Sequence, residues 1–161
     1  MDQQTQMAPD IQAFFDKTLP NDKGTHVLCI GENHTKSEHI HFLQNQLSNL
    51  RINHNLSVIG EERPVIYNVL LWAYKDGTLQ KELGSKERAQ SYFRDIWLAG
   101  VAYDADHINQ EASVATVEQA KQTANLLIQA MDLGICPVAF DSRTLHQELA
   151  HENDKKVYQS F

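Results

Sequence analysis

The chain has 161 residues, of which 42% are apolar and 22% are charged, and its formal net charge at pH 7 is −7. This length and composition predict a single globular domain spanning residues 1–161. The acidic balance argues against a broad nucleic-acid or anionic-membrane surface. No apolar stretch approaches the roughly 18 residues that a membrane span needs.

The first half of the chain predicts two helices and two buried strands. Residues 1–24 are expected to form an N-terminal segment with a helix over Asp10–Leu19, because the apolar residues there recur at near-helical spacing. Val27–Ile30 is an uninterrupted apolar run, typical of a strand buried on both faces of a parallel sheet. A helix over about Lys36–Arg51 and a second apolar strand, Leu56–Gly60, follow.

The second half predicts three helices, a third strand and a polar tail. Pro64 suits the first turn of a helix that Gly77 closes. Apolar spacing continues over about Ser85–Val101, and a polar break is expected at Tyr103–His107. The remaining expected elements are a helix from Val114 that stops at Gly134, a strand over Ile135–Phe140, and a polar C-terminal helix or tail over 144–161.

A strand, a helix of about four turns and another strand make a βαβ unit, whose strands run parallel. The fold class predicted is therefore α/β, with a short, mainly parallel three-strand sheet covered by helices. Pro137 within the third apolar run favours an edge position or an irregular start for that strand. The aromatic residues at helical spacing, Trp72, Tyr92, Phe93 and Trp97, are expected in the core.

Each of the three predicted strands ends in charged or imidazole side chains. If all three strands run parallel, these side chains meet at the carboxyl edge of the sheet, where ligands bind in open parallel sheets. The candidate catalytic residues are Glu32, His34, Glu61, Glu62 and Asp141. Arg143 is a candidate for holding an anionic substrate group, and His39, early in the following helix, is a further substrate-binding candidate.

Two uses of such a cluster stay open. A divalent cation could be bound by carboxylate and imidazole ligands, with Glu32, His34 and Asp141 as the candidate set. Alternatively, His34 could act directly as a general base that a neighbouring carboxylate orients. Both routes lead to hydrolysis by activated water. The glycine patterns of phosphate-binding loops and the Gly-x-Ser-x-Gly nucleophile motif are absent from the sequence.

The pattern of an apolar strand, Gly31-Glu32-Asn33-His34, a helix, and a second strand ending in Glu61 or Glu62 resembles the superfamily of erythromycin esterases, ChaN-like haem-associated lipoproteins and TIKI/TraB proteins. The resemblance covers about Val27–Pro64 and, more loosely, Gln119–Arg143. It implies that Glu32 and His34 form the first motif pair and that Asp141 is a later strand-end acid. The chain lacks a lipobox and a second His motif, so a minimal version, a fragment or a repurposed scaffold is also compatible with it.

The expected function is hydrolysis of an ester or amide-type bond, with a small-molecule substrate. The alternative is a non-catalytic module on the same scaffold that binds haem, a metal or a metabolite, or that serves as a protein interaction domain. A divalent metal is the more expected cofactor and haem the less expected one, and a homo-oligomer is compatible with the sequence. The absence of a leader pattern predicts a cytoplasmic protein, or one exported without a classical signal peptide.

Overall fold

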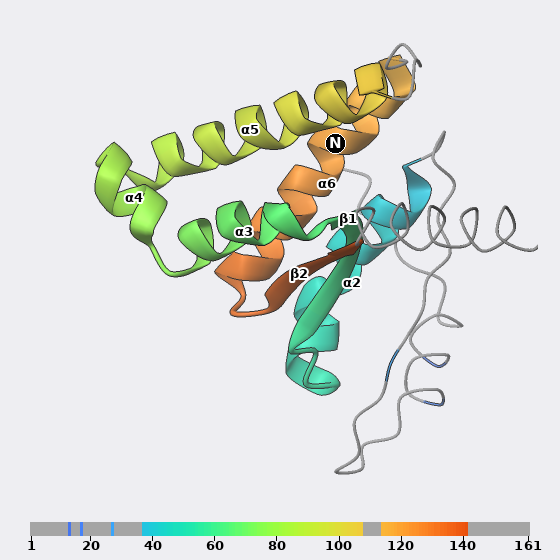
Figure 1. Ribbon diagram of the computed structural model, residues 1–161. Coiled ribbons are helices and arrows are strands. Elements are labelled where there is room, and N and C mark those ends of the chain that lie inside the picture. Colours follow the sequence, from blue (N-terminus) through green and yellow to red (C-terminus); the bar gives the residue numbers. More distant parts are fainter. Residues whose placement is uncertain (1–12, 14–16, 18–26, 28–36, 108–113, 142–161) are drawn as a thin grey trace, which may run out of the picture.

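The computed structural model describes residues 13, 17, 27, 37–107 and 114–141. These residues form a mixed α/β arrangement that is mostly helical (Figure 1). Ala13 and Lys17, both helical, agree with the expected N-terminal helix. The elements in chain order are α2 (Glu38–Asn53), β1 (Val58–Pro64), the 3₁₀ helix η1 (Val65–Tyr67), α3 (Asn68–Lys75), α4 (Thr78–Leu83), α5 (Lys86–His107), α6 (Val114–Asp132) and β2 (Cys136–Asp141).

The sheet consists of β1 and β2, which pair in parallel although helices α3 to α6 separate them in the sequence. Val58 lies opposite Cys136, and Glu61 lies opposite Ala139. The next pair, Pro64 with Asp141, shows an irregularity, because three steps along β1 match two along β2. The parallel direction of these two strands agrees with the expected mainly parallel sheet, whereas the expected βαβ unit of Val27–Ile30, the following helix and Leu56–Gly60 is not confirmed.

The predicted third strand is not confirmed. Within the described part of the chain the sheet has two strands, and of the run Val27–Ile30 only Val27 is described. Val27 lies outside any strand and its side chain is 83% exposed, so the prediction of a buried strand is wrong at that position. The other three residues of the run lie outside the described residues.

The helices cover one face of the sheet. α2 and α6 form one apolar cluster around Leu47 and Ile135, and α3, α5 and α6 form a second around Trp97 and Leu127. Ile59 of β1 packs against both clusters, so this strand face is the inner one. At the other face Val58 and Phe140 are exposed. The ring of Phe140 lies over Gly60, where an added Cβ would come within 3.1 Å of it.

The outer edge of β2 is closed by a side chain. The Cys136 N–H donates to the Ser57 carbonyl of the chain leading into β1, so Ala139, three residues on, has its backbone groups on the opposite edge. There the Asn68 amide donates to the Ala139 carbonyl and accepts from the Ala139 N–H, both at 2.9 Å. Pro137 lies on the same edge and has no N–H to offer. At Pro137 and Ala139 this edge therefore offers no free backbone N–H with which a further strand could pair.

Several expected boundaries need correction. β1 does not end at Gly60 but continues through Glu61 and Glu62, because glutamate is compatible with a strand whose faces differ in exposure. Pro64 ends this strand and is the N-cap of η1, rather than a residue in the first turn of a helix. The expected break at Tyr103–His107 is wrong, since α5 runs through His107. Polar residues do not by themselves end a helix, and this stretch contains no Gly or Pro.

The glycine that was predicted to end the helix from Val114 is confirmed. Gly134 adopts a positive φ of 77° directly after α6, and the Ile135 N–H then bonds back to the Ala130 carbonyl. Cys136 is a free thiol in β2. No helix in the described ranges combines the length and the apolar character that crossing a bilayer requires.

The double hydrogen bond of Asn68 generates a stability prediction. Replacing Asn68 by Ala leaves the N–H and C=O of the buried residue Ala139 without these partners, which we expect to lower the free energy of unfolding by about 2–4 kcal/mol. Asn68→Asp keeps an acceptor but loses the donor and should show a large part of this loss. Urea denaturation measures both.

A matched control is Asn53→Ala, because the exposed Asn53 amide donates to the Asn49 side chain within α2 and to no other described group. This variant should stay within about 0.5 kcal/mol of the unmodified protein. Equal effects of the Asn68 and Asn53 substitutions would contradict a structural role for the bond to β2.

Candidate functional site

The predicted site residues that the structure describes lie on three elements. Glu61 and Glu62 are inside β1, Asp141 is the last residue of β2, and His39 is in the first turn of α2. The register places the backbone of Asp141 beside Pro64, three residues after Glu61. Glu32, His34 and Arg143 lie outside the described residues, as does the side chain of Asp141.

The two glutamates of β1 lie in different surroundings. Glu61 is half-buried and lies two residues after Ile59, which packs on the helices, so it belongs to the inner face. Arg63 is half-buried and lies against Trp97 on the same side. Glu62 is exposed and alternates with Gly60 on the outer face. Of the two glutamates that the sequence left equivalent, Glu61 is therefore the one on the helix-covered side of the sheet.

Arg63 is the nearest described cation along the strand to Glu61, and it lies against an aromatic cluster. Its guanidinium carbon is 5.8 Å from the centroid of the Trp97 ring, within the range of a cation–π interaction. Trp97 in turn stacks on Phe93 and meets the edge of Tyr67, with centroid distances of 5.9 and 5.1 Å. Arg63 was not predicted from the sequence as a site residue. Its position two residues after Glu61 was the available signal, because residues two apart in a strand can share one face.

The prediction that the aromatic residues at helical spacing lie in the core is right for two of them and wrong for the other two. Phe93 and Trp97 are fully buried, whereas Tyr92 is exposed and Trp72 retains 55% of its exposure. Helical spacing alone did not distinguish the two sides of α3 and α5, since both sides carry apolar residues. The indole Nε1 of Trp97 is buried and has no hydrogen-bond partner within the part of the chain that the structure describes.

The chemistry available at this edge comes from a carboxylate and a cation on one strand face. A half-buried carboxylate such as Glu61 can accept a proton from water or contribute to a cation site, and Arg63 supplies positive charge two residues away. Among the residues that the structure describes, no group of three or more His, Cys, Asp and Glu side chains could hold a metal ion. The metal set expected from sequence includes Glu32 and His34, which lie outside this part of the chain.

Tyr67 requires a glycine on the neighbouring helix. A Cβ built on Gly100 of α5 would lie 1.8 Å from the Tyr67 hydroxyl oxygen and 2.6 Å from the ring carbon that carries it. Glycine inside a helix costs about 1 kcal/mol relative to alanine. Gly100 is therefore explained by the close approach of Tyr67, which also positions the Trp97 ring.

We expect Gly100→Ala to destabilise the protein by about 1–3 kcal/mol despite the better helix propensity of alanine, because the methyl group overlaps the Tyr67 ring. Thermal unfolding followed by circular dichroism measures the effect. The double variant Tyr67→Ala/Gly100→Ala removes the overlap, so adding Gly100→Ala to Tyr67→Ala should cost little. A full additional cost in the Tyr67→Ala background would show that this contact is not the reason for the glycine.

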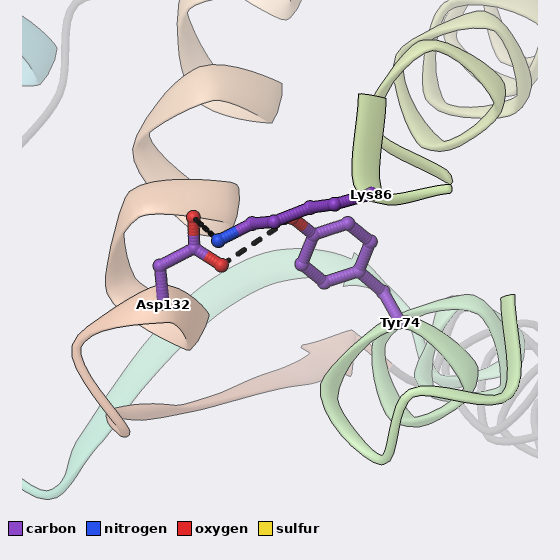
Figure 2. Close-up of polar contacts among 3 residues, drawn as sticks. All are labelled: Tyr74, Lys86 and Asp132. Atoms are coloured by element: carbon purple, nitrogen blue, oxygen red, sulfur yellow. Dashed lines mark hydrogen bonds and ion pairs between the residues drawn. The ribbon is translucent and has the colours of Figure 1, made fainter. Parts of the chain in front are cut away.

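A polar network outside the predicted site joins three helices. Lys86 at the start of α5 is 2.9 Å from an Asp132 carboxylate oxygen at the end of α6, and the Tyr74 hydroxyl of α3 donates to the other oxygen at 3.4 Å (Figure 2). Burial raises the pKa of Tyr74 above its ordinary value of 10.0. The hydrogen bond to Asp132 raises the pKa of Lys86 above 10.5. The network connects the ends of α3 and α6 to the start of α5.

These two shifts define a pH dependence. Both folded-state pKa values are raised, so the stability that they contribute is complete below about pH 10 and is lost as the pH rises through the folded values. Asp132→Asn should lower the free energy of unfolding by about 1 kcal/mol at pH 8, since the pair is partly exposed, and by clearly less near pH 11. Denaturant titrations at the two pH values measure this difference.

The control for this experiment is Glu118→Gln, which removes an exposed pair with Lys121 at 3.9 Å within α6. Its effect should be close to zero at both pH values. An Asp132→Asn effect that is the same at pH 8 and pH 11 would contradict the coupling to Lys86 and Tyr74.

Searches with the sequence and the structure found no matching family model, no matching curated protein and no matching solved structure.

Proposed function

We propose that this chain is a hydrolase-like protein that activates water at the carboxyl edge of its parallel sheet and acts on an ester or amide-type bond of a small molecule. Glu61 is the acid or base of this site, with Asp141 at the end of the neighbouring strand. Glu32 and His34 complete it, in the roles that the resemblance to the erythromycin esterase, ChaN-like and TIKI/TraB superfamily implies.

The observation that carries this proposal is the parallel pairing of β1 with β2. Because the strands run in the same direction, Glu61 in the second half of β1 lies opposite Ala139, two residues before Asp141 at the carboxyl end of β2. Glu61 is half-buried there on the face covered by helices, which reduces its hydration without removing it from solvent. Such a position favours proton transfer over a purely solvated surface role.

Arg63 has a positioning role in this proposal. It shares the inner face with Glu61, and the Trp97 ring limits the directions that its guanidinium can take. A guanidinium in that position can orient the Glu61 carboxylate or hold an anionic group of the substrate, which is the role that the sequence suggested for Arg143.

The second candidate function is a non-catalytic binding module on the same scaffold. The buried Trp97 Nε1 favours it, because a buried donor without a partner costs about 1–3 kcal/mol and a ligand oxygen beside it would recover that loss. The two candidates differ in one respect that is easily measured, since only the hydrolase turns substrate over.

We expect the full chain to hydrolyse p-nitrophenyl acetate above the uncatalysed rate, and Glu61→Gln to lower kcat by about 100-fold or more while the protein stays folded. Glutamine keeps the shape of the side chain and removes its charge and its basicity. Release of p-nitrophenol measures turnover, and circular dichroism verifies the fold. Repeating the assay with a chelator and with added Zn²⁺ or Mn²⁺ tests whether a metal takes part.

Two controls sharpen the result. Glu62→Gln changes the adjacent residue on the outer face, and Glu82→Gln changes an exposed residue of α4; neither should reduce kcat appreciably. Loss of activity in Glu62→Gln equal to that in Glu61→Gln would contradict the assignment to Glu61. A folded protein without turnover on ester and amide substrates would favour the binding module.

A further inference from the structure

The packing of Trp97 accounts for its ring but not for the nitrogen of that ring. Trp97 is fully buried, where it stacks on Phe93 and meets the edge of Tyr67. Both are aromatic contacts, which a ring without a nitrogen makes equally well. A buried indole N–H normally has a hydrogen-bond partner, and within the described part of the chain Nε1 of Trp97 has none. A donor is therefore held away from water at a cost that the core contacts do not explain.

Arg63 places a positive charge against the same ring. Its guanidinium carbon is 5.8 Å from the ring centroid of Trp97, and its side chain is half-buried, so Arg63 contacts both this buried ring and solvent. A guanidinium carries five N–H donors, so it can bind an anion while it keeps its other contacts. Because Nε1 belongs to the ring against which the guanidinium lies, the two kinds of donor are neighbours on the inner side of β1.

These two groups determine the charge of a ligand that they share. Both are donors and neither accepts a hydrogen bond, so the ligand must present acceptor atoms. A full positive charge in a partly buried place favours an anionic acceptor over a neutral carbonyl, and it disfavours a metal ion or another cation. The oxygens of one carboxylate or phosphate group are close enough to each other to accept from both nitrogens at about 2.7–3.2 Å.

We propose that Arg63 and the indole N–H of Trp97 together bind one anionic oxygen group, a carboxylate or a phosphate, of a small molecule. This inference deepens the proposed function by naming a ligand class, and it rests on that proposal for the placement of the site on the inner face of β1. Glu61 lies on the same face, two residues before Arg63. Because its carboxylate has the same charge as the ligand, the bound anion lies on the Trp97 side of Arg63.

Nuclear magnetic resonance of the full chain tests the proposal at the atom concerned. The chain has two tryptophans, so the indole signal that remains in Trp72→Phe belongs to Trp97, and the exposed position of Trp72 makes this change mild. Acetate and inorganic phosphate are titrated separately at constant ionic strength. At least one of them should shift the Trp97 indole signal in a saturable manner with a Kd of about 1–10 mM, because so few atoms limit the affinity. The neutral acetamide should cause no saturable shift.

A charge variant and its matched control test the role of Arg63. Arg63→Gln removes the positive charge and should weaken anion binding by about tenfold or more. Arg88→Gln makes the same change at an exposed arginine near the start of α5 and should leave the Kd unchanged.

A change of one atom tests the role of the indole N–H. Benzothienylalanine in place of Trp97 has a sulfur where the N–H was and keeps the shape of the ring. In the Trp72→Phe chain it should weaken anion binding by about fivefold or more, followed through the backbone amide signals. It should not lower the free energy of unfolding measured without an anion. A loss of stability there would show that the N–H has a partner inside the protein and would overturn the proposal.

Glu61→Gln separates the anion site from the proposed reaction. Removing a like charge should keep or tighten anion binding, whereas kcat should fall. A protein that hydrolyses no ester but binds the anion through Arg63 contradicts the reaction alone. An indole signal without a saturable shift for either anion, or equal Kd values for Arg63→Gln and Arg88→Gln, would overturn the anion site even if the protein turns over p-nitrophenyl acetate.

Discussion

The parallel pairing of β1 with β2 is the constraint on which the described structure depends. It joins residues 58–64 to residues 136–141, so four helices must fit into one crossover that begins at η1 and ends with α6. Arg51 supports this pairing where the strands begin, since its guanidinium donates to the carbonyls of Leu56 and Leu133. At the other end of the strands the same pairing places the backbone of Asp141 beside Pro64, three residues after Glu61.

The sequence predicted the elements whose signal is local and periodic. α2 and α6 bury apolar residues at every third or fourth position, and the uninterrupted apolar runs mark the two strands. What it missed depends on long-range contacts. Asn68 bonds to Ala139 across 71 residues, and Tyr74 reaches Asp132 across 58, and no local pattern identifies either partner. α4 also escaped prediction, because its six residues carry too few apolar positions to show a period.

The candidate site was predictable to a similar degree. Glu61, Glu62 and Asp141 could be named from sequence because charged side chains follow apolar runs directly, but in the structure the two glutamates lie inside β1 and not at its end. The choice between Glu61 and Glu62 was not, because it requires knowing that the strand continues to Pro64 and which of its faces the helices cover. Once Ile59 is placed on the inner face, the period of two assigns Glu61 to the same side, and the contact with Trp97 assigns Arg63 to it.

The placement of α3 explains why the prediction that Trp72 lies in the core is wrong. The segment lies between the sheet edge, where Asn68 bonds to β2, and the aromatic cluster, where Leu71 and Tyr74 are buried. These two inner contacts fix the rotation of the helix, so Val69 and Trp72 must face outward whatever their hydrophobicity. Burying a large apolar side chain is worth about 1.5–3 kcal/mol, so leaving several exposed forgoes a gain comparable to the marginal stability of a whole domain.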